Sequence, residues 1–217
     1  MATSQGDNTL VISYLTLRRA LGMLGLFLPV TLVAGNYFLS GRLIELSISA
    51  YYYTVMRDVF VGIMVAVGLF LFSYKGYELK DNLAGHLGCL CAIGVSWFPT
   101  SPAFNPTARE EIIGMVHLGF AAVLFLTFAY FALALFTKTD PNGVPTPRKK
   151  RRNVIYYVCG VVILLCITGM LLIGVFRSQI APAIEDYAPV FWLESIAVLA
   201  FGFSWLVKGE TLWQDEN

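Results

Sequence analysis

The chain has 217 residues, of which 57% are hydrophobic and only 13% are charged, and its formal net charge at pH 7 is +1. A soluble domain carries about 25% charged residues, so this chain lacks the charge to cover a water-facing surface, and its apolar excess is expected to face lipid. The near-zero net charge and the absence of a basic domain argue against a nucleic-acid-binding protein. The composition therefore predicts an integral membrane protein.

Six apolar runs, each close to the length of a membrane span, follow one another along the chain. A bilayer core about 30 Å thick needs about 20 mostly apolar residues in a helix, and these runs lack the alternation of membrane β-strands. We predict an all-α membrane protein whose residues 1–217 form a single integral membrane domain, a bundle of six transmembrane helices. The predicted helices lie at about residues 21–39, 56–74, 83–98, 112–136, 154–176 and 189–207.

The first run has features of a secretion signal, because Arg18 and Arg19 directly precede it. Signal peptides, however, have apolar regions of about 7–15 residues that end at a small-residue cleavage site. The run at 21–39 is longer and has no clear cleavage site of this kind. We therefore predict that it is retained as the first membrane helix.

Basic residues divide unevenly between the two sets of segments that connect the predicted helices. The segments 1–20, 75–82, 137–153 and 208–217 together hold 11 of the 15 Lys and Arg residues. The opposite segments hold the other four, Arg42, Arg57, Arg109 and Arg177. Cytoplasmic loops carry the excess of basic residues, so we predict that both termini are cytoplasmic in a multi-pass protein of the cell membrane, the inner membrane if the chain is bacterial. We interpret the basic run at 148–152 as a topology anchor that can also contact anionic lipid head groups.

Small residues recur four positions apart in two of the predicted helices. The pairs are Gly62 with Ala66, Ala84 with Gly88, and Gly88 with Ala92. Such spacing lets helix backbones approach one another closely in lipid. It predicts a compact bundle and carries no chemistry of its own.

Three ionisable residues are predicted to share one layer near the outer ends of the helices. Asp58 lies at the outer end of the second helix, whereas His117 and Glu194 lie about one and a half turns into the fourth and the sixth. Ionisable side chains inside a span are costly and normally face the bundle interior. These three are the candidate metal ligands. With Ser49 they are also the candidate catalytic residues. The candidate ligand-binding residues are Tyr51, Arg57, Asp58, Ser96, Trp97, His117 and Glu194.

The outer loops are rich in aromatic residues and proline, which suits segments that fold over the mouth of the bundle at the interface. They would form a lid over a pocket lined by Asp58, His117 and Glu194. The alternative is an interfacial aromatic belt in which Arg57 pairs with Glu194 or with Asp58. The sequence leaves both interpretations open.

Short motifs between about residues 39 and 136 give the chain a family resemblance. They read Ser49-Ala-Tyr51, then Gly62 and Gly68, then Phe98-Pro99-Thr100-Ser101-Pro102, then Gly114-Met115-Val116-His117. In these motifs the chain resembles the bacterial six-helix membrane proteins of the DUF998 family, and more distantly the Frag1/DRAM/Sfk1 membrane proteins. Ser101 stands where that family has Asp, which weakens a ligand role for that position. The resemblance implies a six-helix architecture and no particular activity.

Three classes of function stay open. An apolar pocket with a few convergent polar groups is typical of ligand sites, so we predict a membrane protein that binds a lipid or small molecule in an outer-leaflet pocket, with membrane lipids as its partners. The first alternative is an intramembrane lipid hydrolase or lipid-modifying enzyme. In it, Asp58, His117 and Glu194 would hold an ion such as Zn²⁺, or His117 would act as general base for Ser49. The second alternative is a small channel or transporter.

Overall fold

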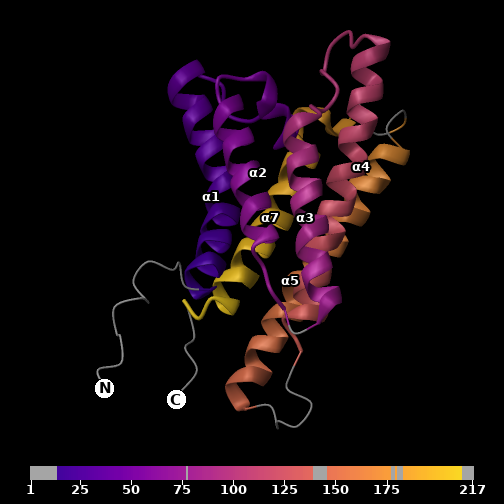
Figure 1. Cartoon of the computed structure of the whole chain (residues 1–217). Helices are drawn as coiled ribbons and strands as arrows, with labels where there is room; N and C mark the ends of the chain where they lie inside the picture. Colours follow the sequence, from indigo (N-terminus) through magenta and orange to yellow (C-terminus); the bar gives the residue numbers. More distant parts are fainter. Residues whose placement is uncertain (1–13, 77, 139–145, 177–178, 180–182, 212–217) are drawn as a thin grey trace.

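The computed structural model describes residues 14–76, 78–138, 146–176, 179 and 183–211. Within these ranges the chain forms six long helices, each at the position of one apolar run (Figure 1). They are α1 (Tyr14–Ser40), α2 (Arg57–Phe72), α3 (Leu79–Trp97), α4 (Ala108–Tyr130), α5 (Pro147–Val175) and α7 (Pro189–Lys208). The shorter elements are the 3₁₀-helices η1 (Ser49–Tyr53) and η3 (Glu185–Tyr187) and a π-helical turn, η2 (Phe131–Leu135), that continues α4. The prediction of an all-α fold is confirmed.

Several helices begin well before the apolar run that predicted them. The hydroxyl of Thr146 caps α5 by accepting a hydrogen bond from the Lys149 N–H at 3.1 Å, so the basic run is helical. Thr107 and Glu110 form a capping box that starts α4. Lys and Arg are good helix formers, and an apolar run marks only the part of a helix that suits lipid. The predicted starts at 112 and 154 are therefore too late.

The helices form a closed ring in chain order. Each packs against the next one along the chain, and the ring closes where α1 packs against α7, while α4 touches α7 only slightly across the centre. The start of α1, the end of α7 and the start of α5 lie at the same end of the bundle (Figure 1). We call this the basic end, and the opposite end, which carries η1, the loop end.

Four helices are long and apolar enough to cross a membrane, which gives the chain the character of an integral membrane protein. They are Tyr14–Ser40, Ala108–Leu135, Pro147–Val175 and Glu185–Lys208. The other two long helices do not meet this criterion. With 16 residues, α2 is about 24 Å long at 1.5 Å per residue, less than the thickness of the bilayer core. α3 begins with Lys80 and Asp81 in its first turn.

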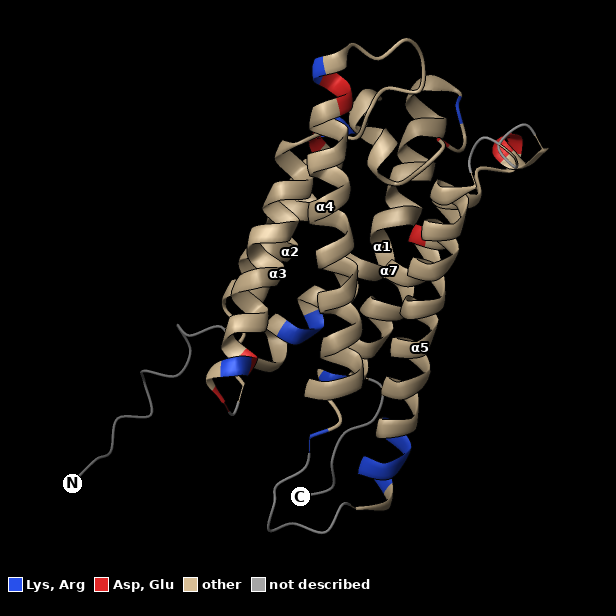
Figure 2. Cartoon of the chain, turned by 90° about the vertical axis from the view of Figure 1, so that its right-hand side faces the viewer, with Lys and Arg blue, Asp and Glu red and all other residues tan. Residues whose placement is uncertain are grey.

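Lysine and arginine gather at the basic end, where the first turns of α5 carry the largest group (Figure 2). The Arg18 side chain donates to the Lys208 carbonyl at 3.4 Å, and the Arg19 side chain donates to the Gly209 carbonyl at 2.9 Å. The described chain therefore begins and ends at the same end. Of the four basic residues assigned to the opposite side, Arg177 lies outside the described residues.

An ion pair with a buried carboxylate connects the start of α3 to the segment that follows η2. The Lys138 ammonium lies 2.6 Å from an Asp81 carboxylate oxygen and 3.6 Å from Glu78, and Asp81 is only 1% exposed. The hydrogen bond to Asp81 raises the pKa of Lys138 above its ordinary value. Lys138 therefore remains charged, which a buried carboxylate partner requires.

Aromatic side chains close the bundle near the basic end. Trp205 is completely buried, and its ring centroid lies 5.6 Å from that of Tyr74, 5.3 Å from Phe131 and 4.9 Å from Phe136. Rings at these distances make favourable edge contacts in addition to the area they bury. We call Tyr74, Phe131, Phe136 and Trp205 the aromatic plug.

Candidate functional site

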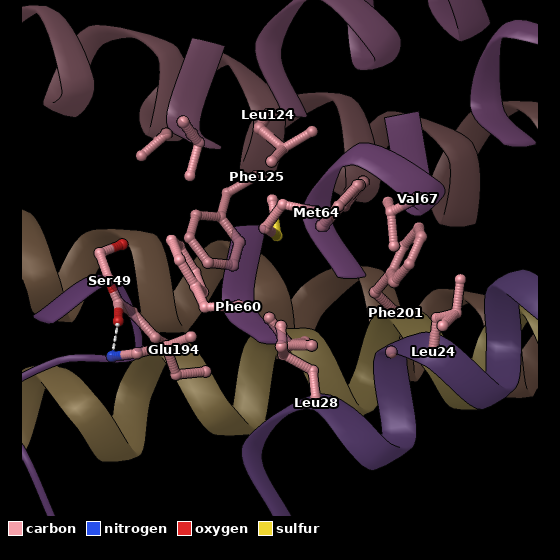
Figure 3. A pocket seen from close by; sticks show the side chains of 16 residues that line it. Leu24, Leu28, Ser49, Phe60, Met64, Val67, Leu124, Phe125, Glu194 and Phe201 are labelled. Carbon is pink, nitrogen blue, oxygen red and sulfur yellow. Dashed lines mark hydrogen bonds between the residues drawn. The ribbon is translucent and has the colours of Figure 1, made fainter. Parts of the chain in front are cut away.

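An apolar cavity of about 40 Å³ lies inside the ring of helices (Figure 3). It extends from Ile48 and Ser49 at the loop end to Phe128 and Phe201, whose ring centroids are 3.7 Å apart. Its walls come from α1, α2, α3, α4 and α7, and all its lining residues are apolar except Ser49 and Glu194. One water position needs about 10–15 Å³, and an apolar cavity stays dry. The cavity therefore suits a slender apolar group.

Glu194 closes the cavity at the loop end. One of its carboxylate oxygens accepts a hydrogen bond from the Ile48 N–H at 2.6 Å (Figure 3), and the Ser49 N–H also donates to this carboxylate. Glu194 is only 9% exposed. Because a buried N–H without a partner costs about as much as a lost hydrogen bond, this carboxylate stabilises the chain where it enters η1.

The first loop (residues 41–56) folds over the mouth of the ring and is held there by hydrogen bonds to α7 and to the segment after α3. The Phe191 N–H donates to the Leu46 carbonyl at 3.1 Å, which joins the loop to α7. The Tyr53 hydroxyl donates to the Thr100 carbonyl at 2.7 Å. Within the loop, the Tyr51 hydroxyl donates to Leu43 at 2.9 Å, and burial raises the pKa of Tyr51 to about 12, so it stays a donor at neutral pH.

His117 binds the end of α3 and does not line the cavity. Its Nδ1 lies 2.6 Å from the Phe98 carbonyl oxygen. Because a carbonyl only accepts, Nδ1 carries the proton and donates. Nearby, the Ser96 hydroxyl donates to the Ile93 carbonyl of its own helix at 2.8 Å, whereas Trp97 is 71% exposed and points away from the interior. Trp97 is thus placed as an interfacial side chain.

Asp58 and Arg57 line a different space, a polar hollow of about 520 Å³ at the loop end. The Arg57 Nε donates to the Tyr52 carbonyl at 2.6 Å, and its guanidinium lies 4.8 Å from the centre of the Tyr52 ring. Within the described residues Arg57 forms no ion pair with Glu194 or Asp58, so the pairing that belongs to the aromatic-belt alternative is not formed. The hollow is lined by Asn36, Ser40, Arg42, Tyr53, Thr54, Val55, Arg57 and Asp58.

The predicted cluster is therefore distributed over three places. Glu194 and Ser49 lie on the cavity, Asp58 lies on the hollow, and His117 lies between α3 and α4. In the part of the chain that the structure describes, no group of three or more His, Cys, Asp or Glu side chains is arranged to hold a metal ion. The central cavity is thus an apolar space and the hollow a polar one.

Some site residues were missed from the sequence. Asn36 lies inside the first predicted span and is completely buried, so the rule that selected Glu194, a polar group within a span, would also have found it. The apolar cavity wall carries no such signal, because cavity-lining and packing residues look alike in a sequence.

Comparisons of the chain with protein-family models, with curated proteins and with solved structures found no match.

Proposed function

We propose that this is a six-span membrane protein that binds the end of the apolar chain of a lipid in its central cavity. In this proposal α2 and α3 also cross the bilayer, as members of the closed ring, and the basic end faces the cytoplasm. The uneven division of basic residues between the two ends supports this orientation. The observation that carries the binding proposal is the apolar cavity between the first loop and Phe128.

The chemistry of the cavity favours a chain rather than a head group. The Glu194 carboxylate is engaged by backbone N–H groups of the first loop, and the other walls are apolar apart from Ser49. A charged head group placed there would lose its hydration without gaining hydrogen-bonding partners. A hydrocarbon chain has no such cost and gains dispersion contacts with the walls.

The alternatives have less support. A hydrolase needs a nucleophile and a base within hydrogen-bonding reach, and Ser49 and His117 line different parts of the bundle. A channel needs a polar path through the bundle, whereas the packed rings of the aromatic plug are buried near the basic end. No observation favours either over lipid binding.

A cavity-filling substitution tests the proposal. Ala121 lines the cavity, whereas its neighbour Ala122 on α4 is exposed on the outer face of the same helix. We expect Ala121→Phe to reduce the lipid that copurifies with the detergent-solubilised protein by at least five-fold, because the new ring occupies the binding space. Ala122→Phe, with the same change in size and hydrophobicity, should leave it unchanged.

The measurement is extraction and mass spectrometry of bound lipid per mole of folded protein, with folding checked by thermal unfolding. Equal lipid content in the wild type, Ala121→Phe and Ala122→Phe would overturn the proposal, as would a wild-type protein that carries no lipid. If Ala121→Phe does not fold, Ala121→Leu provides a smaller filling of the same wall.

A further inference from the structure

The polar hollow at the loop end combines two positive side chains with one negative side chain. Arg42, Arg57 and Asp58 line it together with the hydroxyl residues Ser40 and Thr54. None of the ion pairs in the described ranges involves Arg42, Arg57 or Asp58. Its volume of about 520 Å³ is in the range of small-molecule sites, about 300–1,000 Å³. The hollow is thus large enough for a ligand, and Arg42, Arg57 and Asp58 form no ion pair with one another.

The end of α1 places Arg42 beside this hollow. Gly41 ends the helix with a φ of +74°, a left-handed conformation that glycine adopts without strain, and its N–H donates to the Tyr37 carbonyl at 2.9 Å. The Arg42 N–H then donates to the Ser40 hydroxyl at 3.4 Å. The chain therefore turns sharply at Gly41, and Arg42 leaves the turn on the side of the hollow.

Arg57 is held in position by its own backbone neighbour. Its Nε donates to the Tyr52 carbonyl, which uses one of the five N–H donors of a guanidinium. The remaining donors lie on the two terminal nitrogens, which suit the oxygens of a phosphate. Asp58, the next residue, supplies the negative group among the lining residues of the hollow.

Exposed apolar side chains lie next to the lining residues of the hollow in the sequence. Phe38 is 81% exposed, Leu39 69%, Leu43 57% and Val55 58%, and these residues flank the polar lining residues in the sequence. Apolar side chains at the end of a membrane helix lie in the interfacial and acyl region of the leaflet. A ligand in the hollow is therefore at the level of lipid head groups, with hydrocarbon beside it.

We propose that this hollow binds the head group of a zwitterionic phospholipid, with its phosphate at Arg42 and Arg57 and its ammonium group at Asp58. This site is separate from the central cavity and goes beyond the proposed function. It requires that the loop end lies at a membrane surface, and it does not require that the cavity is filled.

Lipid binding to the full chain in detergent, followed by native mass spectrometry, tests the site. The probes are phosphatidylethanolamine, phosphatidic acid and diacylglycerol with the same chains, glycerophosphoethanolamine and inorganic phosphate. We expect the double variant Arg42→Gln/Arg57→Gln to bind phosphatidylethanolamine at least ten-fold more weakly and diacylglycerol unchanged. The matched control is Arg109→Gln, an exposed arginine at the same end that does not line the hollow.

Asp58→Asn should reduce the preference for phosphatidylethanolamine over phosphatidic acid, because it removes the partner of the ammonium group.

Unchanged phosphatidylethanolamine binding in the double variant overturns the proposal. Inorganic phosphate or glycerophosphoethanolamine that binds as tightly as the lipid overturns the membrane-lipid assignment and leaves a soluble phosphate site. Arg42→Gln alone provides the readout if loss of the Tyr52 contact unfolds the double variant. Ala121→Phe separates the two sites, because it should not alter this head-group preference.

Discussion

Glu194 is an ionisable side chain within a membrane-spanning helix, and its carboxylate accepts hydrogen bonds from backbone N–H groups of another segment. An ionisable group at this depth is expected to pair or to work, and here it accepts hydrogen bonds from the Ile48 and Ser49 N–H groups. These donors begin a short 3₁₀-helix, where N–H groups have no partner within the helix. The carboxylate supplies that partner from another element and so connects the first loop to α7.

Glu194→Gln should weaken this connection. The amide keeps one acceptor oxygen but replaces the other with a donor that opposes a loop N–H, and an unsatisfied buried donor costs about 1–3 kcal/mol. We expect lower thermal stability and faster hydrogen exchange in residues 42–53. Glu185→Gln, at an exposed acid of the loop end, is the control. Unchanged exchange in residues 42–53 of Glu194→Gln would contradict the assigned role.

Like Glu194, His117 is buried, with only 4% of it exposed. Its position inside an apolar run predicted this burial. The expected convergence with Asp58 and Glu194 did not follow from depth. Residues at one depth in a ring of six helices can face different gaps, and His117 faces the end of α3. Depth is readable from a sequence, whereas direction around the bundle axis is not.

At the scale of elements, glycine and alanine decide how closely helices pack. Gly88 and Ala92 on α3 are buried against neighbouring helices, as their spacing predicts. Gly62 differs, because a Cβ at that position would have nothing within 4 Å. A further close backbone contact is between α1 and α7, where a Cβ on Gly202 would lie 2.7 Å from the Gly22 carbonyl oxygen. This pair was missed because its partners lie at opposite ends of the sequence.

Gly202→Ala should therefore push α1 and α7 apart. The added methyl meets backbone atoms of Gly22, Gly25 and Leu26 at 2.7 to 3.0 Å, and such overpacking costs about 1–3 kcal/mol. Gly119→Ala is the matched helical control, because a Cβ there is in open space, and it should gain up to about 1 kcal/mol from helix propensity. Thermal unfolding in detergent measures both, and equal stability of the two variants would disprove the close contact.

At the scale of the whole molecule, the ends of the bundle differ in charge, and this difference predicts its orientation in the membrane. In a background without native cysteines, Cys introduced at Arg109 should react with a membrane-impermeant maleimide on intact cells. Cys introduced at Lys150, in the exposed basic run of α5, should react only after the membrane is permeabilised. Labelling at position 150 from outside intact cells would reverse the proposed topology.

The sequence by itself determined the all-α fold class, the positions of the helices and the uneven division of basic residues. These properties are local, because the apolar length of a segment and its charge depend only on the residues it contains. It also identified Glu194 and His117 as buried polar groups within apolar runs. Helix ends were less accurate, since capping by Thr107 and Thr146 extends α4 and α5 beyond their apolar parts.

Only the tertiary structure decided what surrounds these residues. The ring closure of α1 on α7, the central cavity and the polar hollow each depend on residues from distant parts of the chain. The hydrogen bond from Ile48 to Glu194 joins residues 146 positions apart. Such contacts follow from how whole helices rotate and pack against one another, because packing must fill the space between several elements at once. No local pattern in a sequence specifies that rotation.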